Sequence, residues 1–215
     1  MSIRTRGFSR TSIYRCTGVL VVALCLGGCL SAGRKHRPAI ETQDANGFSI
    51  TEATFIGIGV RSDFDAANRA ISKKDFQRGI KLLEEVTMAS PELCASHINL
   101  AIAYQRADDL ELAEASLLRA LEANPRHPVA HNELGIVYRR TGRFDQARES
   151  YEMALALQPK FHFARKNLAI LCDLFLSDPE CALKHYALYL EAAPEDEAAE
   201  IWIADLKNRV GHEEN

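Results

Sequence analysis

The chain has 215 residues, a length that suits one or two domains. Apolar residues make up 47% and charged residues 26%, as in a soluble globular protein, which excludes a disordered chain, a collagen-like repeat and a protein with many membrane spans. The formal net charge is −3, but the first 28 residues carry four arginines and no acid, and the remainder has 22 basic and 29 acidic residues. An acidic body of this kind does not favour nucleic acid as a partner.

The first thirty residues have the pattern of an export signal. Four arginines precede a short apolar run, Thr17 to Leu26. As a helix this run would be about 15 Å long, half of the ~30 Å hydrocarbon core of a bilayer, so the apolar region of a signal peptide fits it better than a membrane span. The run ends in Leu26-Gly27-Gly28-Cys29, which resembles the lipobox of bacterial lipoproteins.

This resemblance implies that Cys29 carries a diacylglyceryl thioether, that the chain is cleaved before it, and that the new N-terminus is acylated. Several acyl chains anchor a protein stably where one chain would be marginal. Leu30 and Ser31 follow, and the lack of Asp there implies, in the lipoproteins it resembles, export to the outer membrane. The alternative is an ordinary signal peptide in which Cys29 stands by chance. We expect a signal peptide at 1–28, a lipidated N-terminus and tether at 29–59, and a lipid-anchored protein of the bacterial envelope facing the periplasm.

Two segments separate the anchor from the rest of the chain. Residues 30–47 are polar and without periodicity, as in a tether. Residues 48–60 are apolar and contain two glycines. A strand and an irregular segment packed on the next helix fit this second segment equally well.

The remainder of the chain is an internal repeat with a period of about 34 residues. Seven positions of one unit recur in the next as small, apolar or aromatic residues: Leu100, Ala101, Tyr104, Ala113, Leu117, Ala120 and Pro125 become Leu134, Gly135, Tyr138, Ala147, Tyr151, Ala154 and Pro159. The pattern extends back to Ala66 and, after one inserted residue, forward to Pro194. It resembles the tetratricopeptide repeat (TPR) over about residues 60–196, with His97 and His131 in the place of the usual tryptophan.

Helical periodicity supports the same interpretation. The first apolar residues of each unit share one helical face, and the later ones share the face of a second helix. Small residues such as Gly135 and Ala147 would let the two backbones approach. One pair cannot bury its own faces, so pairs must stack. The sequence predicts an all-α solenoid of about four antiparallel helix pairs, followed by a capping helix in 197–215, with Trp202 and Leu206 packed on the fourth pair and Gly211 just beyond the helix end.

Motifs of catalysis are absent from the sequence. It has no P-loop, dinucleotide-binding glycine motif or nucleophile elbow, so we expect neither an enzyme nor a cofactor. His127 lies four residues before His131, which itself stands one repeat period after His97, and these spacings leave a metal-dependent enzyme as a remote alternative. The metal hypothesis is disfavoured because His127 precedes Pro128 and should therefore lie outside the helix that carries His131. Packed or half-exposed histidines in the place of the tryptophan are the favoured interpretation.

Two further groups of residues permit more than one interpretation. Cys172 and Cys181 flank the turn at Ser177–Pro179, where a disulfide and a buried unpaired pair are equally compatible with the sequence; the lack of Cys-x-x-Cys argues against a redox enzyme. The only local basic cluster is formed by Arg139, Arg140, Arg143 and Arg148. It fits a solvated helix end with favourable dipole contacts, or a site for an acidic partner segment.

The resemblance to TPR proteins implies a concave face lined by the first helices of successive repeats. Asparagines there could hold an extended peptide backbone, and isoleucines could give apolar contact, although the isoleucines would equally fit packing between repeats. The family's clamp for chaperone tails needs Lys and Arg at places that here hold mostly other residues, so we expect no such clamp. By register, seven residues should point to this face: Asn99, Ile102, Asn132, Ile136, Lys166, Asn167 and Ile170.

The predicted function is therefore a membrane-tethered scaffold that binds an extended segment of an envelope protein. Bacterial TPR lipoproteins of this layout resemble accessory proteins of pilus assembly and secretion. Outer-membrane protein insertion and recruitment of cell-wall enzymes are the alternatives within the same class.

Overall fold

The computed structural model describes residues 39–43, 47–51 and 57–213. Strands β1 (Ala39–Gln43) and β2 (Gly47–Thr51) pair in antiparallel register, with Ile40 opposite Ile50. The sequence did not predict β1, whereas β2 shows that a strand forms at the start of the segment 48–60. The expected signal peptide and Cys29 lie outside the described residues.

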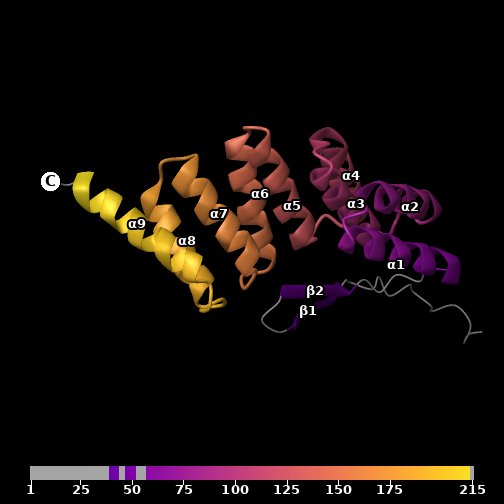
Figure 1. The fold of residues 1–215 in the computed structure, drawn as a ribbon, viewed down its shortest axis with the longest axis horizontal. Coiled ribbons are helices and arrows are strands. Elements are labelled where there is room, and N and C mark those ends of the chain that lie inside the picture. Colours follow the sequence, from indigo (N-terminus) through magenta and orange to yellow (C-terminus); the bar gives the residue numbers. More distant parts are fainter. Residues whose placement is uncertain (1–38, 44–46, 52–56, 214–215) are drawn as a thin grey trace, which may run out of the picture. The chain divides into compact units, whose positions relative to one another are not determined.

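From residue 58 onward the described chain is a succession of antiparallel helix pairs (Figure 1). Each pair packs on the next, and α9 (Glu197–Glu213) packs on α8, which confirms the all-α solenoid of about four pairs with a capping helix. None of the described helices combines the length and apolar character that a membrane crossing requires. The pairs are α1 (Ile58–Ser72) with α2 (Phe76–Ala89), α3 (Cys94–Arg106) with α4 (Leu110–Ala123), α5 (Pro128–Arg140) with α6 (Phe144–Leu157), and α7 (His162–Leu174) with α8 (Pro179–Leu190).

The turn inside each pair contains one residue with a left-handed backbone. Lys74, Asp108 and Gly142 have φ of 64°, 66° and 76° and follow one another at intervals of one repeat period. In the fourth pair the residue is Ser177, with φ of 51°, one position later than the period requires. The single inserted residue predicted from the sequence therefore lies at or before this turn.

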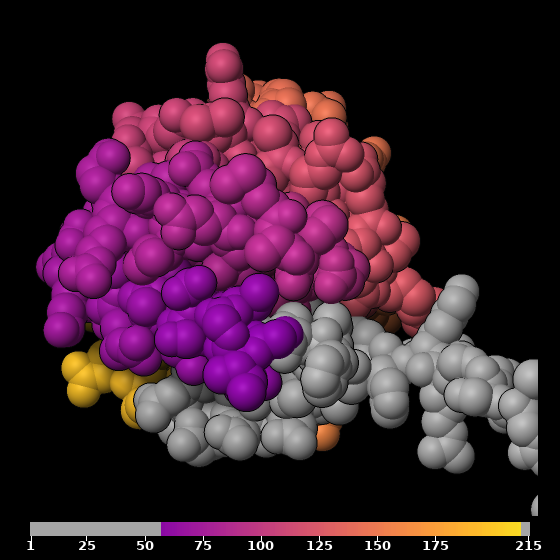
Figure 2. Space-filling model, turned by 90° about the vertical axis from the view of Figure 1, so that its right-hand side faces the viewer, coloured from indigo at the N-terminus to yellow at the C-terminus, as the bar shows by residue number. Residues whose placement is uncertain are grey.

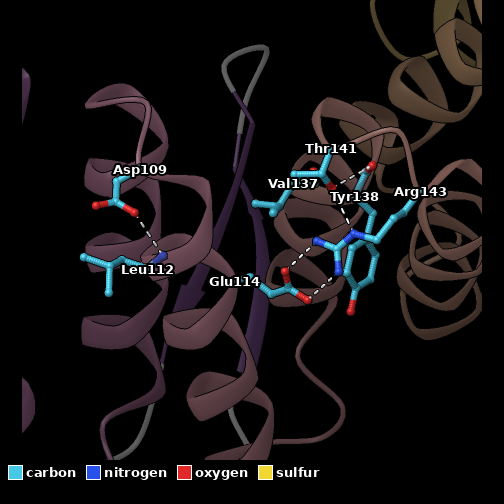
Figure 3. Close-up of polar contacts among 7 residues, drawn as sticks. All are labelled: Asp109, Leu112, Glu114, Val137, Tyr138, Thr141 and Arg143. Atoms are coloured by element: carbon cyan, nitrogen blue, oxygen red, sulfur yellow. Dashed lines mark hydrogen bonds and ion pairs between the residues drawn. The ribbon is translucent and has the colours of Figure 1, made fainter.

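Three of the second helices begin with an aspartate that caps the helix. The carboxylates of Asp75, Asp109 and Asp178 each accept a hydrogen bond from the backbone N–H three residues later. Arg143 occupies this place before α6 and provides no side-chain cap. Its guanidinium instead binds Glu114 of the preceding repeat (Figure 3).

Small residues allow the helices of a pair to approach closely. A Cβ atom placed on Gly135 of α5 would lie 2.5 Å from a ring carbon of Tyr151 on α6, and Tyr151 is fully buried. Ala147 is also fully buried. These contacts confirm the predicted helix crossing.

In the space-filling view the surfaces of the first helix pair and of the following repeat are continuous (Figure 2).

The capping helix packs as the sequence predicted but ends later. Leu206 is only 2% exposed, and the ring of Trp202 lies 5.7 Å from that of Tyr186 on α8. The expectation that Gly211 terminates the helix is wrong, because α9 continues to Glu213. A Cβ at Gly211 would meet no atom within 4 Å, so no neighbouring element forces the chain to turn there.

Candidate functional site

The first helices of successive repeats contact one another in chain order, α1 with α3, α3 with α5, and α5 with α7. They form a surface that we call the inner face. Asn68, Ile102, Ile136 and Ile170 occupy equivalent places on it, each one repeat period after the one before. The inner face consists of six of the seven residues predicted from the sequence, since Asn132 is buried, and of four more: Asn68 and Glu133, and, by their helical spacing from Asn167 and Ile170, Phe163 and Leu174.

The isoleucines of the inner face serve mainly as packing between repeats. Ile102, Ile136 and Ile170 are partly buried and lie against the hydrophobic core. This observation favours the packing alternative that the sequence left open. Each isoleucine offers only part of its side chain to a partner.

Asparagine side chains link neighbouring first helices. Asn99 of α3 donates a hydrogen bond to the side-chain oxygen of Asn68 on α1, over 2.8 Å. Asn167 of α7 donates to that of Asn132 on α5, over 2.9 Å. Asn132 is only 3% exposed, so the structure places it in the packing between α5 and α7 and not on an open surface. Alanine at Asn132 would therefore weaken the fold and would be a poor probe of binding.

A glutamate that the sequence analysis missed lies at the centre of the inner face. Glu133 accepts hydrogen bonds from the side chains of Gln105 and Asn132, each over 3.1 Å. Burial raises the pKa of its carboxyl group, while these hydrogen bonds act in the opposite direction. The repeat period could have identified it, since Glu133 stands one period after Asn99 and one period before Asn167.

Lys166 connects the inner face to the capping helix. Its ammonium lies 2.7 Å from the carboxylate of Asp196 and about 5 Å from the ring centroids of Tyr189 and Trp202. Hydrogen bonds from Lys166 and Tyr189 lower the pKa of Asp196 to about 2. Because its charge is already compensated, Lys166 is poorly suited to bind a partner's carboxylate.

Helix α7 carries the exposed apolar part of the inner face. Phe163 is 42% and Leu174 66% exposed, and they share one helical face with Asn167 and Ile170 at intervals of three or four residues. The next residue, Phe175, is 40% exposed and packs on the ring of Phe144, with 4.9 Å between the centroids. Exposed apolar side chains along one face of a helix can form part of an interaction site. The sequence analysis missed Phe163 and Leu174 because it named only the isoleucines and polar residues of this face.

In the second, third and fourth repeats, the residues in the place of the family's tryptophan bind the same backbone group. His97 and His131 bring Nε2 to 2.9 and 3.0 Å from the carbonyl oxygens of Pro91 and Pro125, six residues earlier. Arg165 donates to the carbonyl of Pro159 in the next repeat. His97 is buried and His131 is half-exposed, as predicted for histidines in this place.

The third histidine of the metal hypothesis caps a helix. His127 precedes α5, as predicted, and its Nδ1 accepts a hydrogen bond from the N–H of Ala130 over 3.4 Å. Burial and the nearby His131 lower the pKa of His127 to about 4, so its ring is neutral at pH 7, as an acceptor must be. Within the described ranges, ligand-type atoms of three residues cluster only at Cys172, Asp178 and Cys181, where the two sulfurs are bonded to each other.

Three of the four arginines of the basic cluster bind acids of the protein itself, whereas Arg139 lies over the ring of Phe175, 5.8 Å from its centroid. Arg140 pairs with Asp108, and Arg148 pairs with Asp178. Arg143 binds both carboxylate oxygens of Glu114 and lies over the ring of Tyr138, 4.3 Å from its centroid (Figure 3). Each pair joins neighbouring repeats. Both interpretations from the sequence missed this role, because the acids lie 29 to 32 residues away in the chain.

The structure also decides between the two possibilities for the cysteines. Cys172 and Cys181 form a disulfide that joins α7 to α8, with Cα atoms 5.9 Å apart. Cys94 is buried, and its thiol lies 3.3 Å from the carbonyl oxygen of Ala120.

Comparison with known proteins agrees with this geometry. The tetratricopeptide repeat family matches residues 92–160. A thermophilic TPR protein of Thermus thermophilus is 25% identical, with a TM-score of 0.60, and the match covers 68% of this chain and 80% of that one. The pilF protein of Pseudomonas aeruginosa is 17% identical, with a TM-score of 0.65 and coverage of 71% and 69%.

A peptide complex shares the fold as well. The first TPR of Spaghetti (RPAP3), solved with a bound HSP90 peptide, is 18% identical, with a TM-score of 0.54 and coverage of 58% of this chain and 99% of that one. No curated protein matches the sequence. The family match covers the second and third helix pairs, and the shared fold shows that the helical part of the chain is an all-α solenoid of the TPR type.

Proposed function

We propose that this protein is a lipid-anchored scaffold of the bacterial envelope that binds a segment of a partner protein on its inner face. Proteins built of tetratricopeptide repeats are in general scaffolds for protein–protein interaction and not enzymes. The observation that carries the proposal for this chain is the exposed apolar side chains of α7, where Phe163 and Leu174 lie on the same helical face as Ile170. The peptide bound by the TPR of Spaghetti supports a ligand of peptide type.

Two independent features support a location in the envelope. The sequence Leu26 to Cys29 has the order of a lipobox after a charged segment and an apolar run. The disulfide between Cys172 and Cys181 fits an exported domain, because disulfides persist in oxidising compartments and are rare in the cytosol. We favour pilus assembly or secretion as the process, and this preference comes from the layout of the sequence. The likeness to pilF, at 17% identity, concerns the fold alone and does not identify the process.

The inner face can be tested by photo-crosslinking in living cells. A benzoylphenylalanine residue placed at Phe163 or Leu174 should crosslink to one envelope protein, because both side chains are exposed on the proposed binding face. Met153 on α6 is the matched control, since it is 48% exposed but belongs to a second helix. Mass spectrometry of the crosslinked species identifies the partner. It also distinguishes a pilus or secretion component from a factor for outer-membrane protein insertion or a cell-wall enzyme.

Alanine substitutions measure how much these two side chains contribute to partner binding. Phe163→Ala with Leu174→Ala should lower recovery of that partner about fivefold or more, because binding energy concentrates in a few apolar side chains. Circular dichroism and thermal melting should stay as in the wild type, since both residues are exposed. Equal crosslinking from Met153, or full recovery with the double variant, would show that the inner face is not the binding surface.

The lipid anchor is tested separately at Cys29. Cys29→Ser should abolish incorporation of labelled palmitate and leave the protein unprocessed or released from the membrane, because the thiol is the acyl acceptor of a lipobox. Cys25→Ser is the matched control: it lies four residues earlier in the same apolar run and should be labelled and cleaved normally. Normal labelling and cleavage of the Cys29 variant would contradict the lipoprotein interpretation and leave the binding surface untouched.

A further inference from the structure

The two cysteines of the disulfide occupy unlike positions. Cys172 is fully buried in the last turn of α7. Cys181 is half-buried and is the third residue of α8. Once the bond is reduced, solvent and external reagents would therefore reach the sulfur of Cys181 more easily than that of Cys172.

The helix dipoles act in the same direction as the difference in burial. The N-terminal end of a helix favours a thiolate, and the thiolate is the form that attacks a disulfide. Cys181 stands at such an end, whereas Cys172 stands near the negative end of α7, where burial also disfavours a charge.

Neighbouring charges leave this asymmetry in place. The carboxylate of Asp178 accepts a hydrogen bond from the N–H of Cys181 over 3.0 Å and opposes a thiolate there. Arg148 of α6 pairs with Asp178 at 3.0 Å and offsets its charge. One turn further along α8, burial and nearby cations lower the pKa of His185 to about 4, so this ring carries no charge at pH 7.

We propose that Cys181 is the entry thiol through which a disulfide-carrying oxidant installs the bond, and that Cys172 is the resolving thiol. The Cys181 thiolate attacks one sulfur of the oxidant, an S–S bond forms between them, and the other oxidant sulfur leaves as a thiolate that takes up a proton. The Cys172 thiolate then attacks Sγ of Cys181 and expels the remaining oxidant sulfur. Two protein thiols are oxidised, and one oxidant disulfide is reduced to two thiols.

The experiment uses the full chain with Cys16, Cys25 and Cys29 replaced by serine, so that only the three cysteines of the repeats remain. Reduced Cys172→Ala and Cys181→Ala variants are incubated with oxidised glutathione, and mass spectrometry follows the adduct at each residue. Cys181 in the first variant should capture glutathione about tenfold faster, or more, than Cys172 in the second. A variant that lacks both cysteines is the matched control for adducts at Cys94. The reduced parent should release two reduced glutathiones for each disulfide formed.

Equal capture rates, or faster capture at Cys172, would overturn the assigned order. Circular dichroism verifies that each variant is folded. If either variant does not fold, brief alkylation of the reduced parent by iodoacetamide replaces it. Peptide mapping should then find Cys181 labelled well before Cys172, and equal labelling would refute the proposal. The test needs neither a partner nor a membrane, so its outcome is independent of the proposed function.

Discussion

Gly135→Ala is expected to lower the melting temperature by about 2–12 °C, and Gly135→Leu by more. The added Cβ would lie 2.5 Å from one ring carbon of Tyr151 and 2.7 Å from another. The Tyr151 ring is fully buried, so it cannot swing out into solvent without leaving the core. Overpacking of this kind costs about 1–3 kcal/mol, and each kcal/mol shifts the melting temperature of a domain of this size by about 2–4 °C.

Gly211→Ala is the matched control, because it makes the same change within a helix. A Cβ at Gly211 would meet no atom within 4 Å, so the melting temperature should stay constant or rise slightly. Differential scanning calorimetry of both variants makes the comparison. If Gly135→Leu melts like the wild type, the helix crossing of α5 and α6 is misplaced, and with it the register of the repeats.

Reduction of the disulfide is expected to have an effect of similar size. A bond that closes a loop of about ten residues stabilises a protein by roughly 2.5 kcal/mol in the chain-entropy account. Dithiothreitol should therefore lower the melting temperature by about 5–10 °C. Hydrogen exchange should increase first in α7 and α8, which the bond joins, and in α9, which packs on α8.

The double variant Cys172→Ala with Cys181→Ala is the control for this prediction. It should melt near the reduced wild type and should not respond to dithiothreitol, although Cys94 is still present. A melting temperature of the wild type that is the same with and without dithiothreitol would show that the bond does not stabilise the fourth repeat.

The sequence by itself determined the repeated architecture. Within each helix, apolar residues three and four apart mark one face, because such residues are neighbours on any helix. The repeat period then shows that the same two faces recur in every pair. The inserted residue in the fourth repeat was visible for the same reason, and the turn at Ser177 shows it as a left-handed residue one place late. The small residues at Gly135 and Ala147 indicated a close helix crossing, since only small side chains permit one.

Only the tertiary structure decided which residues join one repeat to the next. The pairs Asn132 with Asn167 and Arg143 with Glu114 connect residues 35 and 29 positions apart. The repeat period places Glu133, and not Asn132, one period after Asn99. Only the packing of α7 on α5 shows that Asn132 is the residue that bonds to Asn167. The bond between Cys172 and Cys181 was undecided for a related reason: it requires two Cα atoms within 5.9 Å, and the packing of α7 on α8 sets that distance.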